Sequence, residues 1–341
     1  MASPTQICVV GAGAIGGLMA ARLALAGASV SVVARGAHLE AIRRNGLKLV
    51  EQDGSERVAA PRATDRIADL GPHDIVILAM KAHQLAPVAS ELTSLTGPET
   101  VFVTAQNGLP WWYFFKHGGP HEGRHLESVD PAGAIASRID AGRVIGCIVY
   151  PAAEIAAPGV IRHMEGNRFP VGEIDGADTP RVRRVAQLLR EAGFRAPVLS
   201  KIRTEIWVKL WGNCTFNPIS ALTHATLSDI CRFPLSRRLA ADMMAEAQAV
   251  AGRLGIEFPV SLDQRIAGAE AVGEHKTSML QDVESGRPIE LEALLGSVIE
   301  LGRITQTPTP RLEAVYACAA LLARSLSARN GRLRIEPAGG R

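Results

Sequence analysis

Three polar residues recur at four-residue intervals in one strongly apolar segment of the 341-residue chain. Lys209, Asn213 and Asn217 lie among bulky side chains that include two tryptophans. Residues four apart share one face of a helix, so the spacing predicts a face with an ammonium and two amides. An ammonium can donate a proton and stabilise negative charge, and amides can bind a carboxylate or a hydroxyl. Because such groups are costly among apolar side chains without a ligand, we interpret the face as part of a pocket; a solvated polar stripe is the alternative.

A second polar set lies in residues 275–292. Ser278, Asp282 and Glu290 are spread across a loop that is expected to open a new helix. Taken alone, they have ordinary structural explanations, because Ser278 could cap a helix and Glu290 could complement a helix dipole. Their chemistry stays open at this point.

A glycine pattern near the N-terminus separates an expected strand from an expected helix. A β-branched run over residues 7–10 leads into the glycines, and an alanine-rich stretch follows to Ala26. The first glycine permits a tight turn, the second lets phosphates approach the backbone, and the third lets helix and strand pack closely. The pattern predicts a dinucleotide-binding loop, with an ordinary turn that binds no ligand as the alternative. The expected cofactor contacts are Gly11, Ala12, Gly13, Ala14, Ile15 and Gly16.

Arg35 follows the expected second strand, residues 29–34. An NAD site usually has Asp or Glu here to bind the ribose hydroxyls, and this chain has neither. A guanidinium instead suits the 2′-phosphate of NADP, so we expect NADP(H) as the cofactor. The alternative is a solvated loop arginine.

The scaffold that these residues need is predicted to be α/β: an N-terminal Rossmann-type parallel sheet followed by a second, all-helical C-terminal domain. Short continuous apolar runs are typical of parallel strands covered on both faces, and they occupy residues 7–10, 30–34, 74–80 and 100–105. Pieces that are expected to finish the same sheet, with less regular pairing, are residues 144–150, 159–163 and 169–172.

Helical periodicity dominates the rest of the chain, from a helix expected over residues 178–192 to several segments after residue 200. We therefore predict an NADP-binding domain over residues 1–199 and a helical substrate and catalytic domain over residues 200–330. Residues 331–341 are expected to form a disordered tail.

Composition limits the classes of protein. The 37 Lys plus Arg nearly balance 34 Asp plus Glu, and only 4% of residues are aromatic, so a nucleic-acid partner is not expected. Five scattered cysteines lack metal-binding spacing, which predicts reduced thiols and no metal site. Without a membrane-spanning stretch or a signal-type start, we expect a soluble cytoplasmic protein.

Together the motifs resemble those of the ketopantoate reductase family over nearly the whole chain. The matching features are the glycine loop, Arg35, Lys81, Gln106-Asn107-Gly108, the Lys209 face, and Ser-Met-Leu-Gln-Asp-Val with Glu290 beyond it. The resemblance implies NADPH-dependent reduction of a 2-oxo acid to a 2-hydroxy acid, with 2-dehydropantoate the first candidate, in a cleft between the two domains. We also expect a homodimer.

The same resemblance implies the role of each site residue. Lys209 is the general acid, and Glu290 supports it and binds substrate. Asn213, Asn217 and Ser278 hold the substrate, Asn107 lies between substrate and nicotinamide, and Lys81 lies near the cofactor.

One segment departs from the family pattern. Trp111, Trp112, Tyr113, Phe114 and Phe115 form a consecutive aromatic run that begins shortly after Asn107. We predict that the rings pack in the core or at an interface. The alternative is an aromatic wall beside the substrate, which would suit a bulkier 2-oxo acid.

Two further classes of protein remain as alternatives. Dehydrogenases of the hydroxyisobutyrate, 6-phosphogluconate or glycerol-3-phosphate type also pair a Rossmann domain with helices and use a lysine. A non-catalytic NADP-binding sensor would have no reason to keep the Lys209 face, Ser278 and Glu290 together.

Overall fold

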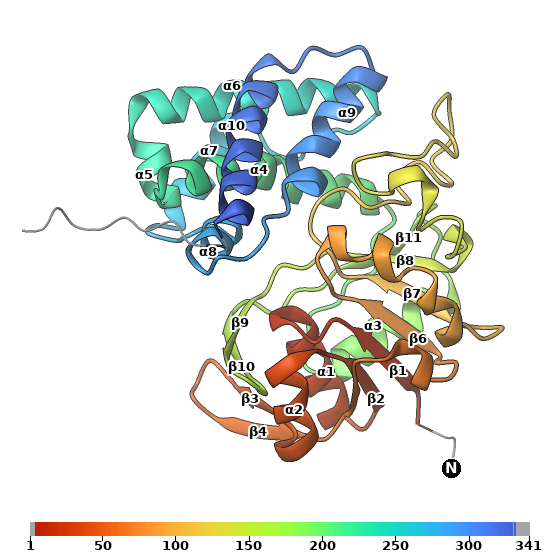
Figure 1. The fold of residues 1–341 in the computed structure, drawn as a ribbon. Helices are drawn as coiled ribbons and strands as arrows, with labels where there is room; N and C mark the ends of the chain where they lie inside the picture. The colour runs from red at the N-terminus through yellow and green to blue at the C-terminus, as the bar shows by residue number, and fades with distance from the viewer. Residues whose placement is uncertain (1–3, 330, 332–341) are drawn as a thin grey trace, which may run out of the picture. The chain divides into compact units, whose positions relative to one another are not determined.

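The computed structural model describes residues 4–329 and 331, and it divides the chain into two compact units, Met1–Arg203 and Thr204–Arg341 (Figure 1). The first unit contains a parallel-dominated sheet and the second is helical, which confirms the predicted fold class. The division falls close to the predicted boundary at residues 199 and 200, and the functional roles given to the two domains stay predictions. Of the tail over residues 331–341, all but Gly331 lies outside the described residues.

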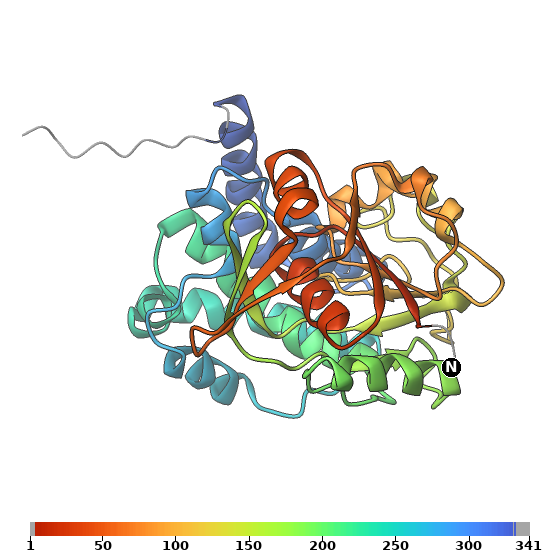
Figure 2. The same cartoon turned by 90° about the horizontal axis from the view of Figure 1, so that it is seen from below.

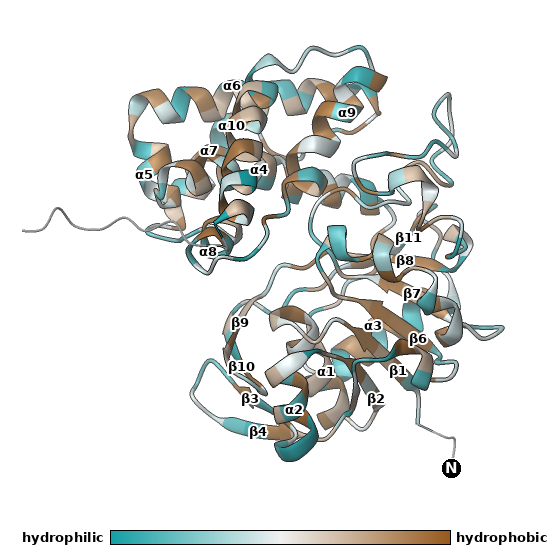
Figure 3. Cartoon of the chain, viewed as in Figure 1, coloured by the Kyte–Doolittle hydropathy of each residue, from teal (hydrophilic) through white to brown (hydrophobic). Residues whose placement is uncertain are grey.

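The main sheet of the first unit has seven strands in the order β11-β8-β7-β6-β1-β2-β5. All neighbours are parallel except β8 and β11. The strands are β1 (Gln6–Val10), β2 (Ser29–Val33), β5 (Arg62–Thr64), β6 (Ile75–Leu78), β7 (Val101–Thr104), β8 (Val144–Cys147) and β11 (Val171–Glu173). The central strands are among the most hydrophobic parts of the chain, as Figure 3 shows, because both of their faces are covered. Strand order reverses at β1, which has β2 on one side and β6 on the other.

A second sheet of four strands, in the order β4-β3-β10-β9, was not predicted from the sequence. Its strands are β3 (Leu47–Val50), β4 (Glu56–Ala59), β9 (Ala152–Ala157) and β10 (Val160–Glu165). The prediction that residues 159–163 finish the main sheet is therefore wrong. Strand β10 pairs in parallel with β3, more than a hundred residues earlier in the chain, a long-range pairing that no local pattern specifies.

The helices of the first unit are α1 (Ala14–Leu25), α2 (Gly36–Asn45) and α3 (Pro180–Glu191). Helix α1 packs against strands of both sheets (Figure 2). The close approach depends on Gly17, because a Cβ there would lie 2.6 Å from Cδ1 of Ile161 in β10. Six short 3-10 turns complete the unit: η1 (Ile67–Asp69), η2 (Ala82–Gln84), η3 (Ala86–Val88), η4 (Glu91–Leu95), η5 (Pro131–Gly133) and η6 (Ala141–Arg143).

The second unit consists of helices connected by loops. They are α4 (Ile202–Thr223), α5 (Leu227–Arg232), α6 (Pro234–Arg253), α7 (Leu262–Ala271), α8 (Ser278–Glu284), the π-helical turn η7 (Glu292–Gly296), α9 (Ser297–Ile304) and α10 (Pro310–Ala328). Helix α4 buries both of its tryptophans, Trp207 and Trp211, and its first two residues belong to the first unit. Within the described residues, no helix is long and apolar enough to cross a membrane.

Candidate active site

The glycine loop connects β1 to α1, and two of its glycines are required by close packing. Gly11 has a φ of +97°, and a Cβ there would lie 2.9 Å from the Met80 nitrogen. A Cβ at Gly16 would lie 2.0 Å from the Gly11 carbonyl oxygen. These two positions therefore build the tight turn and bring the first turn of the helix against it.

Gly13 has a different role, because a Cβ at this position would meet no heavy atom within 4 Å. It is the N-cap of α1, its φ of −68° is open to any residue, and no side chain caps the helix. The first turn of α1 carries no acidic residue. An uncapped helix N-terminus with open space in front of it fits the pyrophosphate of a dinucleotide.

We expect Gly13→Ala to weaken cofactor binding at least about tenfold, or ~1.4 kcal/mol, since its methyl group would occupy the space that the phosphates need. The melting temperature of the cofactor-free protein should not change, because that space is empty of protein atoms. Fluorescence titration and thermal unfolding measure the two effects. The matched variant Gly16→Ala should instead lower the melting temperature. Unchanged affinity in Gly13→Ala would exclude this loop as the phosphate site.

Arg35 is the N-cap residue of α2 and lies directly after β2. Its side chain is exposed, and its guanidinium makes no hydrogen bond or ion pair with any other residue that the structure describes. The first turn of α2 contains no acidic residue. The cation is therefore available for an anionic ligand at the end of β2.

Lys81 and Asn107 follow β6 and β7, whose carboxyl ends lie at the same sheet edge as the glycine loop. Lys81 is the N-cap of η2. Gln106 joins the two loops, because its Nε2 donates to the Met80 carbonyl at 2.9 Å. No separate role was predicted for Gln106, although its place beside Asn107 in the motif could have indicated one. The predicted residues of the first unit thus gather at one edge, at the reversal of strand order where α/β sheets bind ligands.

In the second unit, α4 presents the predicted polar face. Lys209 and Asn213 are half-buried, and Asn217 is 5% exposed, so the stripe is not fully solvated. Asn217 Nδ2 donates to Ser278 Oγ at 3.4 Å, which brings together two predicted substrate residues 61 positions apart. Ser278 does not cap α8, because the preceding Thr277 accepts from the Leu280 nitrogen instead.

Glu290 and Asp282, from the second polar set, have different surroundings. Glu290 is half-buried and lies shortly before the π-helical turn η7, a geometry that is frequent at functional sites. Asp282 is buried and pairs with Arg287 at 3.0 Å, which gives it a structural role.

Family models match both parts of the chain. Residues 7–176 match the family described as ketopantoate reductase PanE/ApbA, and residues 201–323 match its C-terminal model. The chain belongs to the ketopantoate reductase family. This finding confirms the resemblance that the motifs indicated.

Individual relatives agree with the family models. The chain is 55% identical to a 2-dehydropantoate 2-reductase of Mesorhizobium japonicum over 93% of its own length and 98% of the relative. A 2-dehydropantoate 2-reductase of Archaeoglobus fulgidus is 30% identical over 87% of this chain and 90% of the relative. Among solved structures, one assigned to a ketopantoate reductase of Ralstonia solanacearum MolK2 is 43% identical, with a TM-score of 0.91 and coverage of 95% of this chain and 99% of that chain.

In this member of the ketopantoate reductase family, the aromatic segment is packed inside the first unit. Trp111 to Phe114 are each at most 2% exposed and lie in consecutive turns. Trp112 Nε1 donates to Thr104 Oγ1 at 3.0 Å, at the end of β7. Trp111 and Phe115 meet edge to face with ring centroids 6.0 Å apart. Burial and the indole hydrogen bond support the packing interpretation.

Proposed function

We propose that the protein catalyses NADPH-dependent reduction of 2-dehydropantoate to pantoate. The observation that carries this proposal is the 55% identity, over 93% of the chain, to a relative named 2-dehydropantoate 2-reductase. The open Gly13 position and the lysine-amide face of α4 supply the two chemical functions that such an enzyme needs. A non-catalytic NADP sensor would require only the first of them.

The residues proposed to hold the cofactor all belong to the first unit. The glycine loop, Gly11 to Gly16, would bind the pyrophosphate through backbone N–H groups of α1. Arg35 would pair with the 2′-phosphate, and Lys81 and Asn107 would lie near the nicotinamide end. When bound, NADPH supplies the hydride for the reduction.

Lys209 is proposed as the general acid. Addition of a hydride to a ketone places negative charge on the carbonyl oxygen, and an ammonium stabilises that charge and delivers the proton. Glu290 would support Lys209 and bind substrate. Asn213, Asn217 and Ser278 would hold the substrate carboxylate and hydroxyl through donors and acceptors of both kinds. The bond from Asn217 to Ser278 already sets two of these groups side by side.

Arg35 should determine the preference for NADPH over NADH. We expect at least about a tenfold preference in kcat/KM, or ~1.4 kcal/mol, because a guanidinium can pair with the 2′-phosphate. Arg35→Ala should erode this preference and leave kcat at saturating cofactor nearly intact. Arg44→Ala, which removes another exposed arginine of α2, is the matched control. Equal kcat/KM for the two cofactors in the unmodified protein would refute the assignment.

Loss of NADPH absorbance with a panel of 2-oxo acids tests the function. The panel should include 2-dehydropantoate, 2-oxoisovalerate and phenylpyruvate, so that a bulkier preferred substrate is detected. The proposal expects the highest kcat/KM for 2-dehydropantoate. No turnover of any 2-oxo acid would overturn it.

We also propose a cytoplasmic homodimer. No disulfide bond joins the five cysteines, which suits a reducing compartment. Phe233 and Leu235, at the start of α6, are 58% and 71% exposed, which suits an interface between copies. Light scattering coupled to size-exclusion chromatography measures the oligomeric state, and a monomer would contradict the proposed homodimer.

A further inference from the structure

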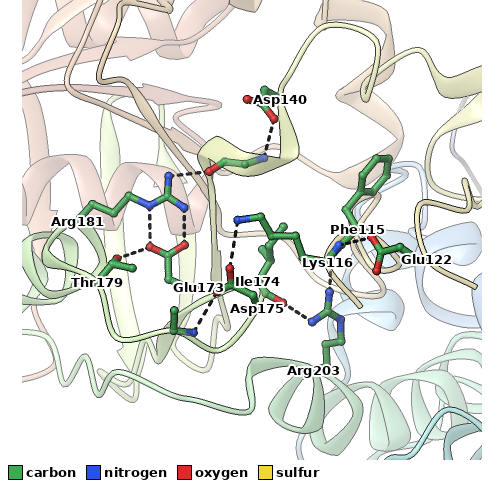
Figure 4. Close-up of polar contacts among 12 residues, drawn as sticks. Phe115, Lys116, Glu122, Asp140, Glu173, Ile174, Asp175, Thr179, Arg181 and Arg203 are labelled. Carbon is green, nitrogen blue, oxygen red and sulfur yellow. Dashed lines mark hydrogen bonds and ion pairs between the residues drawn. The ribbon is translucent and has the colours of Figure 1, made fainter. Parts of the chain in front are cut away.

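Arg203, the second residue of α4, binds three backbone carbonyl groups from two separate segments. Its Nε donates to the Tyr113 oxygen at 2.9 Å, and its Nη2 donates to the Phe115 oxygen at 2.7 Å. Its Nη1 donates to the Ile174 oxygen, just beyond β11 (Figure 4). The guanidinium thus joins the start of α4 to the aromatic segment and to the end of the main sheet.

No carboxylate pairs with Arg203 among the described residues, although acidic groups lie nearby. Asp175 pairs with the side-chain Nζ of Lys116 at 3.2 Å, and Glu122 accepts a hydrogen bond from the backbone nitrogen of Lys116 (Figure 4). The Arg203 guanidinium instead lies over the rings of Trp112 and Tyr113, at 5.7 and 5.8 Å from their centroids. Because its partners are dipoles and rings, its contribution is the fixed geometry of its planar donors rather than neutralisation of a charge.

The neighbouring residue, Ile202, is fixed by an independent feature of the sheet. Gly146 and Gly172 pair in register across β8 and β11, and both lie against this side chain. A Cβ at Gly146 would lie 2.9 Å from Ile202 Cγ1, and a Cβ at Gly172 would lie 3.1 Å from Ile202 Cβ. The paired glycines therefore form a notch for Ile202. Two successive residues at the beginning of α4 are thus held by the first unit.

We propose that Arg203 is a positioning residue for Lys209, an inference that rests on the proposed function. Lys209 lies six residues further along the same helix, a rise of about 9 Å. A helix transmits a displacement of its first turn to the residues it carries. Misplacement by about 1 Å can lower a catalytic rate by about 100-fold. The hydrogen bonds of Arg203 to the three carbonyl groups would therefore affect the catalytic rate through the position of Lys209, and not through contact with substrate.

Arg203→Lys tests the proposal, because a lysine keeps the charge but cannot reach three carbonyls with planar geometry. We expect kcat to fall at least tenfold while the Kd for NADPH changes less than twofold. Arg143→Lys is the matched control: Arg143 Nη1 also donates to three carbonyl oxygens of the first unit, those of Gly97, Pro98 and Thr100, but none of its contacts involves α4. This variant should lose stability without losing kcat.

A purely structural role would give a different result. If the two lysine variants lowered the melting temperature alike and both kept kcat, the positioning role would be overturned. If Arg203→Lys did not fold, Gly172→Ala would replace it. Its added Cβ would lie 2.6 Å from the Leu199 oxygen and 3.1 Å from Ile202 Cβ, which displaces the start of α4, and the same drop in kcat is expected. Failure of the proposed function is distinguishable, because the unmodified protein would then reduce no 2-oxo acid in the same assay.

Discussion

Replacing Lys209 by alanine is expected to lower kcat for 2-dehydropantoate at least about 100-fold, the range for removal of a general acid together with its charge. Cofactor affinity should persist, since the glycine loop and Arg35 lie in the other compact unit of the chain. Steady-state kinetics with saturating NADPH, together with a cofactor titration, measure both effects. The physical reason is that hydride addition to the carbonyl carbon leaves negative charge on the oxygen, and that oxygen would lose the group that stabilises and protonates it.

Lys201→Ala is the matched control for this variant. Lys201 is an exposed lysine just before α4, so its loss removes the same charge from the same region of sequence. We expect this variant to keep its turnover. A Lys209→Ala protein that reduced the preferred substrate at nearly the unmodified rate would show that another group supplies the proton.

The second large effect is on stability. Trp112→Ala should reduce the free energy of unfolding by about 3–5 kcal/mol, the range for truncation of a large buried aromatic side chain. Trp112 is 1% exposed, donates to Thr104, and lies against the notch glycine Gly146. Denaturant unfolding should therefore show a clear loss of stability. The change in KM should be the smaller effect when both are expressed as free energies.

Thr104→Val separates the two contributions of this tryptophan. The ring stays packed while its N–H loses the acceptor, so we expect a smaller cost of about 1–3 kcal/mol. If Trp112→Ala kept the free energy of unfolding of the unmodified protein but raised KM tenfold, the aromatic segment would line the substrate site and determine specificity. A bulkier 2-oxo acid would then be the better candidate substrate.

Local sequence was sufficient to predict the features that depend on residues close together in the chain. The strand, glycine turn and helix from Gln6 to Leu25 follow from β-branched residues, glycines and alanines in consecutive order. The Lys209 face of α4 follows from a four-residue period. Family membership was also visible in these motifs, and the comparisons confirm it.

Tertiary structure alone decided which distant residues meet. The parallel pairing of β3 with β10 created a second sheet against which α1 packs, and strand preference depends on such tertiary context more than on local sequence. Thr277 caps α8 in place of Ser278, which leaves Ser278 to contact Asn217. The sequence favoured packing of the aromatic run, but the choice between a core and a ligand wall needed the structure, since apolar rings suit both.

The anchoring of α4 shows the same division most clearly. The sequence determined that a polar face exists on this helix, because helical periodicity is a local property of the chain. It did not determine where the helix begins in space, which depends on Arg203 reaching carbonyl groups near residues 113–115 and 174 and on Ile202 meeting two paired glycines. Such contacts form only when the whole sheet is assembled, since each partner is placed by strands far apart in the chain.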